Sequence, residues 1–355
     1  MCDRGLGAAY YELMATPTGP GRPVFVCPLC RGPLRAEVDS YACSACGRTH
    51  SVVDRIPILL LDGTLAEQEE IDHIHAGHDH AAGRHAHKAA QSQHFDRAVA
   101  EGFEITRPHG TPRLYRFLLA EKFRRAVGPI RPHLVGASAL AVCGGSGMDA
   151  EFLARAGAAV TTSDLSLGAA RRAKARSERY GLGIQSIAAD VEHLPFADQS
   201  ADLVAVHDGL HHLDDPYAGL SEMARVARRW IVVTEPARAS ITRLGIRLGL
   251  ALKTEEAGNR VARMEPSEVA AFLEARGYVV LRAERYAMYY PHHPGAVFSL
   301  LSRPFIFPIV RVGWRLANAL FGRIGNKMVV VAERDLAIEA DPASPSTPPR
   351  IRSTA

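Results

Sequence analysis

The chain has 355 residues, enough for one large domain with a smaller one beside it. Its 47% hydrophobic and 23% charged residues are ordinary for a soluble globular protein, and a net charge of +4 indicates no particular partner. No stretch reaches the roughly 18 uncharged apolar residues of a membrane span, and no secretory signal follows Met1, so both classes are excluded.

Changes in composition along the chain predict four segments. Residues 1–62 form a leader and a cysteine-bearing ribbon, and residues 63–93 form a His-rich linker. An α/β domain follows over residues 94–335, and residues 336–355 form a disordered, Pro- and Ser-rich tail. The linker is expected to be polar and free of metal, because nothing fixes the geometry of its histidines.

Two CxxC pairs stand twelve residues apart in the first segment. Cys27 and Cys30 form one pair, and Cys43 and Cys46 form the other. Two such turns can close a tetrahedral Zn²⁺ site with no open position, so we expect a structural zinc ion without a catalytic role. Paired cysteines without a secretory signal also favour the cytoplasm.

The residues around these cysteines resemble a known zinc-ribbon family. Residues 24–61 contain both CxxC pairs and end in Ile56-Pro57-Ile58-Leu59-Leu60. In this they resemble the family that includes the small activator subunit of several RNA and protein methyltransferases. The resemblance implies a partner domain fused to the chain and does not identify a substrate.

In the α/β domain, four β-like runs each end at a polar residue or a glycine turn. The first run leads into the turn Gly144–Gly147, and the next three end at Asp164, Asp190 and His207. A helix predicted over residues 148–156 follows the turn, with Asp149 as its cap. Since open α/β sheets bind ligands at the carboxyl ends of their strands, this pattern predicts a small-molecule site.

The first half of that site does not choose between two cofactors. Gly144, Gly145 and Gly147 let the backbone approach a ligand closely, next to a helix N-terminus. Gly145, Gly147 and Ala150 also fit the dinucleotide fingerprint. Asp164 could accept the ribose hydroxyls of NAD as well as those of S-adenosylmethionine.

The second half of the site resembles one family. A carboxylate at Asp190 precedes Leu194-Pro195-Phe196, and His207 opens a turn that continues to Pro216. With the strand at 230–236, the segment from about 139 to 236 resembles the class I S-adenosylmethionine-dependent methyltransferases of the type 11 group. The resemblance implies a doubly wound, mostly parallel seven-stranded α/β sheet with an antiparallel last strand, plus the small N-terminal zinc ribbon.

The resemblance also implies roles for individual residues in binding S-adenosylmethionine. The turn from Cys143 and Gly144 through Gly145 and Gly147 would border the methionine and ribose. Asp164 would hold the ribose, with Leu165 packed on the adenine. Asp190 would accept from the adenine amino group with Val191 beside it, and His207 would stand near the sulfonium. Two residues depart from the family, which usually has an acid at Ala141 and a glycine at Cys143.

Histidines after the fourth strand are the candidates for a catalytic base. Imidazole titrates near neutrality, which suits a base. His211 and His212 are the first candidates, and His207 is the third. Glu235, at the end of the fifth strand, is a further residue that could face the acceptor. The chain lacks the Asn/Asp-Pro-Pro-Tyr/Phe motif of enzymes that methylate exocyclic amines, which favours O- or C-methylation.

Two lid insertions are expected, at about residues 237–262 and 291–325. The second holds several large apolar residues and four arginines without an acid. It would cover a lipophilic small-molecule acceptor and touch an anionic membrane surface. The basic runs Arg113–Arg131 and Arg171–Arg179 are expected to be solvated helix faces.

Two other functions stay open. The zinc ribbon and the Arg113–Arg131 segment could grip RNA phosphates in an RNA methyltransferase. The chain could instead be a non-catalytic, zinc-dependent binding module. The sequence gives no indication of the oligomeric state.

Overall fold

The computed structural model describes residues 21–61, 88, 101–238 and 264–335. The predicted leader before residue 21, nearly all of the His-rich linker, the first lid insertion and the tail after residue 335 lie outside these residues. No helix among the described residues is both long enough and apolar enough to cross a bilayer.

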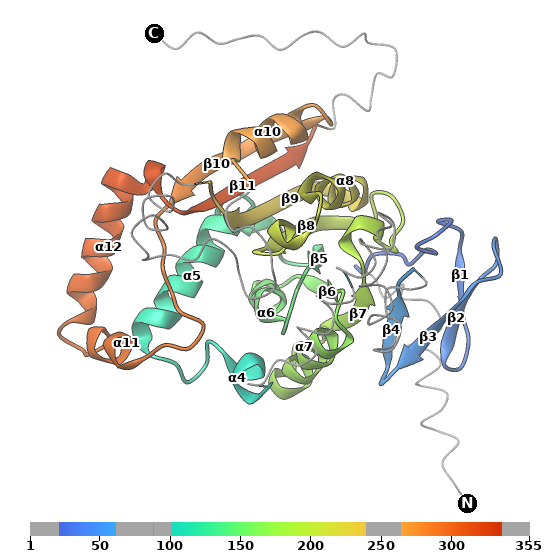
Figure 1. The fold of residues 1–355 in the computed structure, drawn as a ribbon, viewed down its shortest axis with the longest axis horizontal. Helices are drawn as coiled ribbons and strands as arrows, with labels where there is room; N and C mark the ends of the chain where they lie inside the picture. The colour runs from blue at the N-terminus through green and yellow to red at the C-terminus, as the bar shows by residue number, and fades with distance from the viewer. Residues whose placement is uncertain (1–20, 62–87, 89–100, 239–263, 336–355) are drawn as a thin grey trace, which may run out of the picture.

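The described strands form one mixed sheet (Figure 1). Its order is β1-β2-β3-β4-β7-β6-β5-β8-β9-β11-β10. The strands span Leu34–Ala36 (β1), Ser40–Cys43 (β2), Thr49–Val53 (β3), Ile56–Leu59 (β4), Ser138–Val142 (β5), Ala159–Asp164 (β6), Gln185–Ala189 (β7), Ala201–His207 (β8), Ala227–Pro236 (β9), Tyr278–Tyr286 (β10) and Lys327–Arg334 (β11). The strands from β7 to β9 run parallel, and β11 is antiparallel to both of its neighbours, as expected.

The sheet has 11 strands, so the prediction of seven was wrong. The additional strands belong to the ribbon. Its last strand β4 pairs in parallel with β7, with Ile58 opposite Ala188 and Leu59 opposite Ala189. An open edge of a sheet presents unpaired backbone groups, and the apolar Ile56–Leu59 run satisfies them here. The ribbon therefore continues the sheet of the larger domain.

Aromatic packing joins the ribbon to the larger domain at a second place. The ring centroid of Phe25 lies 5.5 Å from that of Phe196 and 5.9 Å from that of Tyr41. All three side chains are buried. Around them, the backbone N–H of Val26 donates to the carbonyl of Pro195. The two parts of the chain thus share one hydrophobic core.

Helices cover both faces of the sheet (Figure 1). They span Glu101–Thr106 (α4), Arg113–Val127 (α5), Met148–Arg155 (α6), Leu167–Tyr180 (α7), Pro216–Val226 (α8), Pro266–Glu274 (α10), Ala296–Leu301 (α11) and Phe307–Phe321 (α12). Along β5 the side chains alternate between the faces. Leu140 and Val142 belong to the core cluster that also holds residues of α8 and α10, while Ala139 and Ala141 belong to the cluster that holds residues of α5 and α6.

The basic runs are not simply solvated helix faces, as had been expected. Lys122 on α5 and Arg172 and Arg176 on α7 are buried. Arg176 donates from Nη1 to Glu151 Oε2 at 2.7 Å and to the carbonyl of Arg107 at 2.8 Å. Its Nε donates to the carbonyl of Ser146, and its Nη2 donates to that of Glu104. This one side chain ties α4 and α6 to the glycine turn, because a buried guanidinium needs several acceptors.

We predict that Phe25→Ala destabilises the whole protein, because it removes a ring packed in the shared core. The expected loss is about 3–5 kcal/mol in the free energy of unfolding, measured by urea denaturation. Val38→Ala, at an exposed site in the ribbon, is the matched control and should change stability by less than about 0.5 kcal/mol. Equal, small effects of the two changes would show that the ribbon does not share the core.

Candidate functional site

The structure gathers the predicted ligand-facing residues at one edge of the sheet. Strands β7, β6, β5 and β8 are neighbours in that order, and they run parallel. Asp190, Asp164, the turn Gly144–Gly147 and His207 therefore stand side by side at their carboxyl ends. This edge includes the point where the strand order reverses, which is the usual ligand crevice of such sheets.

The glycine turn packs closely against β6 at Gly144 and borders open space at Gly145. The N–H of Gly144 donates to the carbonyl of Ser163, and a Cβ on Gly144 would lie 2.0 Å from Thr162 Oγ1. Gly145 adopts φ +51°, and a Cβ there would meet nothing within 4 Å. Gly147, at φ +77°, is the N-cap of α6. The backbone of this turn can therefore contact a ligand directly.

Cys143, which stands where the resembled family has glycine, adopts a left-handed conformation at φ +51°. That conformation costs a residue with a Cβ about 1 kcal/mol or more. The neighbouring Gly209 makes room, since a Cβ there would lie 2.3 Å from Cys143 Cβ. Burial raises the pKa of the Cys143 thiol well above its usual value, so the side chain is neutral.

Asp164 is held in place by backbone donors. The N–H of Gly145 donates to its Oδ2 at 2.8 Å, and the N–H of Ser166 donates to its Oδ1 at 3.0 Å. The aspartate and the next residue, Leu165, are both partly exposed. The end of β6 thus presents a fixed carboxylate beside the glycine turn.

Asp190 makes an ion pair that the sequence did not predict. Lys88 Nζ lies 2.5 Å from Asp190 Oδ2 and also pairs with Glu192. The N–H of Glu192 donates to Asp190 Oδ1, and Val191 beside it is buried. Burial alone would raise the pKa of Asp190, but His193 and Lys88 hold it below its usual value. A residue from the predicted linker therefore contacts the carboxylate expected to bind adenine.

His207 lies between two carboxylates. Its Nδ1 is 2.6 Å from Asp149 Oδ1, and its Nε2 is 3.3 Å from Asp208 Oδ2. The expectation that Asp149 caps α6 was wrong, because this helix has no side-chain cap and Asp149 binds the histidine instead. Burial raises the pKa of Asp149 to about 6. Each ring nitrogen of His207 therefore faces one carboxyl group.

Asp208 is the centre of a charged cluster that sequence reasoning missed. Its Oδ2 accepts from Lys122 Nζ at 2.7 Å and from Lys327 Nζ at 2.8 Å. Burial alone would raise the pKa of Asp208, but these two ammonium groups hold it well below its usual range. The hydroxyl of Tyr290 accepts from Lys122 at 2.7 Å. Among the described residues nothing hydrogen-bonds to Asp208 Oδ1, which is buried and could accept from a ligand.

The two candidate base histidines differ in their surroundings. His211 is buried, and its Nδ1 lies 2.7 Å from Glu235 Oε2. Glu235 is also buried, and its Oε1 accepts from the N–H groups of Gly209 and Leu210. This carboxylate therefore holds the loop together, which contradicts the expectation that it faces the acceptor. His212 is partly exposed and stacks on His211 with centroids 4.1 Å apart.

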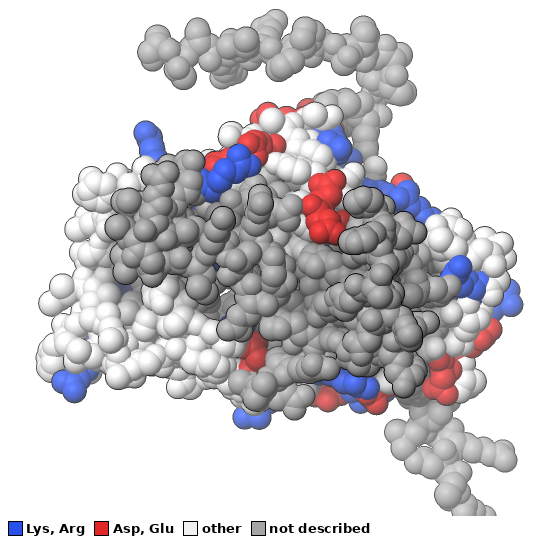
Figure 2. All heavy atoms as spheres, in the orientation of Figure 1, with Lys and Arg blue, Asp and Glu red and all other residues white. Residues whose placement is uncertain are grey.

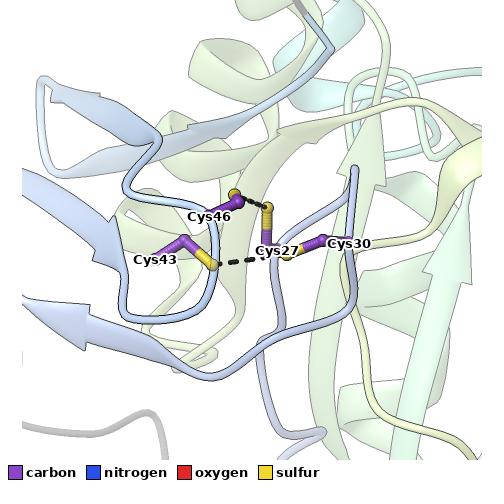
Figure 3. Close-up of side chains that lie close together, drawn as sticks. All are labelled: Cys27, Cys30, Cys43 and Cys46. Carbon is purple, nitrogen blue, oxygen red and sulfur yellow. Dashed lines mark hydrogen bonds between the residues drawn. The ribbon is translucent and has the colours of Figure 1, made fainter.

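The four cysteines of the ribbon converge as expected (Figure 3). Their sulfur atoms all lie within 4.8 Å of one another, with Cys30 and Cys43 3.5 Å apart and Cys27 and Cys46 3.8 Å apart. Zn–S bonds of about 2.3 Å in a tetrahedron place sulfurs about 3.8 Å apart, so this donor set fits zinc. Backbone N–H groups lower the pKa of Cys43 to about 6, which favours its thiolate.

Part of the missed cluster had a signal in the sequence. Asp208 directly follows a strand that was expected to end at the site, so its position could have identified it. Lys122 was hidden among the basic residues of α5. Tyr290 and Lys327 come from segments far along the chain, where no motif marks them.

Comparison with known families identifies part of the chain. Residues 140–230 match the type 11 family described as "Methyltransferase domain". This segment contains the glycine turn, Asp164, Asp190 and His207. This part of the chain is therefore similar to a methyltransferase domain, and the match ends before α10, α11 and α12.

Curated relatives also match part of the chain. A demethylmenaquinone methyltransferase of Corynebacterium urealyticum is 36% identical over 134 residues, which cover 37% of this chain and 52% of that protein. One of Renibacterium salmoninarum is 35% identical over 133 residues, covering 37% and 51%. The chain thus matches about half the length of these relatives.

Solved structures align with the chain at lower sequence identity. Magnesium protoporphyrin IX methyltransferase from Synechocystis, with bound SAH, aligns with a TM-score of 0.47 and 14% identity. The alignment covers 70% of this chain and 100% of that one.

We predict that Asp149→Asn changes how stability depends on pH. The pKa of Asp149 is raised to about 6 in the folded protein, against about 3.9 for an unfolded aspartate. The stabilising contribution of its proton is therefore lost as pH rises through about 6. Asparagine keeps the hydrogen bond to His207 at every pH.

The free energy of unfolding should then shift in favour of the variant by about 3 kcal/mol as pH rises from about 4 to about 6, measured by urea denaturation at several pH values. Parallel stability curves for the two proteins would contradict the raised pKa.

Proposed function

We propose that the protein is a cytoplasmic S-adenosylmethionine-dependent methyltransferase that acts on a small lipophilic acceptor. The observation that carries this proposal is the arrangement of the Gly144–Gly147 turn, Asp164 and Asp190 at one sheet edge, within the segment that matches a methyltransferase domain. S-adenosylmethionine supplies a methyl group already activated by the positive charge on sulfur.

The residues at this edge fit that nucleoside. The open space above Gly145 suits close contact with the methionine and ribose. Asp164 would accept the ribose hydroxyls, and the partly exposed Leu165 would pack on the adenine. Asp190 would accept from the adenine amino group once Lys88 shares or leaves that oxygen. These roles are the ones expected from the sequence, and they remain proposals.

Asp208 would supply the carboxylate that the resembled family usually has at the position of Ala141. Its Oδ1 is buried without a hydrogen-bond partner among the described residues, so it has the capacity to accept from an ammonium group. The following residue, Gly209, packs directly on Cys143 at the end of β5. A negative charge at this place would also stabilise the sulfonium through space.

Apolar and aromatic side chains next to Asp208 favour a lipophilic acceptor. Tyr290 contacts Asp208 and Lys122, and its ring lies against Tyr115. Phe298 on α11 and Met148 on α6 complete the same cluster. The curated relatives are named for demethylmenaquinone, which supports an acceptor of this type. We propose O- or C-methylation of such a molecule.

The chain's own part in the transfer is to align the acceptor and remove a proton. His212 is the better candidate for a base, because it is partly exposed whereas His211 is buried. His207 would stand near the sulfonium, between Asp149 and Asp208.

The structure favours this function over RNA methylation. In the Arg113–Arg131 segment, Lys122 pairs with Asp208, Arg124 with Glu121 and Arg125 with Glu284. Charges already neutralised within the protein contribute little to phosphate binding.

We also propose that the four cysteines hold a structural Zn²⁺ ion. The closed set of thiolates leaves no position for a substrate, so the metal would fix the turns that carry β1 to β4. Because β4 pairs with β7, a loss of metal would weaken the edge of the main sheet as well.

The methyl-transfer proposal is tested with methyl-labelled S-adenosylmethionine and a host lysate separated into RNA, protein, lipid and water-soluble fractions. We expect label in the lipid-extractable fraction. Asp164→Asn should lower the rate about 10-fold or more, because a charged hydrogen-bond acceptor is lost. Asp54→Asn, at an exposed site in the ribbon, is the matched control. Label in RNA would support the second function, and cofactor binding without any labelled fraction would support a non-catalytic module.

The zinc proposal is tested by metal analysis and thermal unfolding. Cys43→Ser should abolish zinc binding and lower the free energy of unfolding by at least about 2.7 kcal/mol when zinc is present at a hundred times its Kd. Cys143→Ala, which changes a cysteine outside the cluster, should retain the metal. The proposal would be refuted if the unchanged protein were purified without zinc and the Cys43→Ser and Cys143→Ala variants were equally stable.

A further inference from the structure

One face of α11 and α12 is apolar and open to solvent. On α12, Ile309, Val312, Leu316 and Leu320 follow one another at helical spacing, with exposed fractions of 73%, 52%, 58% and 73%. Phe305, just before the helix, is 90% exposed. Single exposed apolar residues are normal, but a continuous stripe of large ones marks an interaction surface. We name this stripe with Phe305 the α12 face.

The opposite side of α12 is fixed to the protein, so the α12 face cannot turn inward. Trp314 packs on Phe117 with ring centroids 5.5 Å apart. Asn318 accepts from the N–H of Ala287 at 2.8 Å and donates to its carbonyl at 3.0 Å. Helix α12 therefore has two apolar sides, one packed on the protein and one exposed to solvent.

The charge around the α12 face has one sign. Residues 295–325 contain four arginines, Arg303, Arg311, Arg315 and Arg323, and no aspartate or glutamate. Arg315 pairs with Glu121, but among the described residues no carboxylate pairs with Arg311 or Arg323. Figure 2 shows the end of the molecule formed by α11 and α12 almost without acidic side chains.

We propose that the α12 face docks on an anionic phospholipid surface. A helix with large apolar residues on one side and flanking arginines lies in the interface of a bilayer, where acyl chains receive the apolar side chains and phosphates receive the arginines. A second copy of the chain fits less well. A two-fold contact between two such faces would bring arginines against arginines.

Docking there would place the site close to the lipid. The inner side of α11 carries Phe298, whose ring lies against Tyr115 in the cluster next to Asp208. The surface and the acceptor side of the site are therefore two sides of the same insertion. The evidence for docking is independent of the proposed methyl transfer, so either proposal can fail alone.

Co-sedimentation with vesicles tests the proposal. We expect the full chain to bind vesicles of phosphatidylcholine mixed with phosphatidylglycerol, and to bind phosphatidylcholine alone at least about tenfold more weakly. The triple variant Ile309→Ser, Leu316→Ser, Leu320→Ser should lose binding about tenfold or more, because three inserted aliphatic side chains are removed. A control triple, Val38→Ser, Val135→Ser, Leu281→Ser, changes exposed apolar residues elsewhere and should bind like the unchanged protein.

A double variant separates the electrostatic attraction to phosphates from the insertion of apolar side chains. Arg311→Gln with Arg323→Gln should reduce the preference for anionic vesicles while leaving the apolar stripe intact. Thermal unfolding, measured on every variant, checks that the fold is retained. Binding that neither triple variant changes, or no binding to either vesicle, would overturn the proposal. A fall in molar mass in sedimentation velocity, specific to the α12 variant and without vesicle binding, would assign the face to a second copy instead.

Discussion

The close approach of the Gly144–Gly147 backbone to β6 is the constraint on which the rest of the site depends. Thr162 leaves no room for a side chain at Gly144, and the amide of Gly145 then points to Asp164. Arg176 holds the turn from the other side through the carbonyl of Ser146. The left-handed Cys143 shows how strong this constraint is, because the chain keeps the turn's shape at the cost of an unfavourable φ and a glycine at position 209.

Two chemically different regions border this turn. On one side stand Asp164 and Asp190, the carboxylates proposed to bind the nucleoside. On the other, Asp208 stands between Lys122 and Lys327 and beside the aromatic cluster around Tyr290. The two lysines keep Asp208 charged in a buried place, and His207 lies between this carboxylate and Asp149. The aromatic side of this region leads outward to α11, so the proposed lipophilic acceptor and the proposed lipid-facing surface would be parts of one arrangement.

The sequence was sufficient to predict the strands of the main sheet and the residues at their ends, because short apolar runs stopped at Asp164, Asp190 and His207. The cysteine cluster followed from its spacing alone. Contacts between distant segments were not predictable. Lys122 and Lys327 lie 86 and 119 residues from Asp208 along the chain, and nothing local distinguishes either from a solvated lysine. The pairing of β4 with β7 was missed because an apolar strand does not reveal which open edge it completes.

Calorimetric titration of the pure, zinc-loaded chain tests the central claim most directly. The ligands are S-adenosylhomocysteine, which shares every contact proposed for the nucleoside and the methionine, and NAD. The account predicts saturable binding of S-adenosylhomocysteine at one site per chain and no binding of NAD. Uptake of NAD together with no uptake of S-adenosylhomocysteine would contradict it, because the turn and the two aspartates would then serve a dinucleotide.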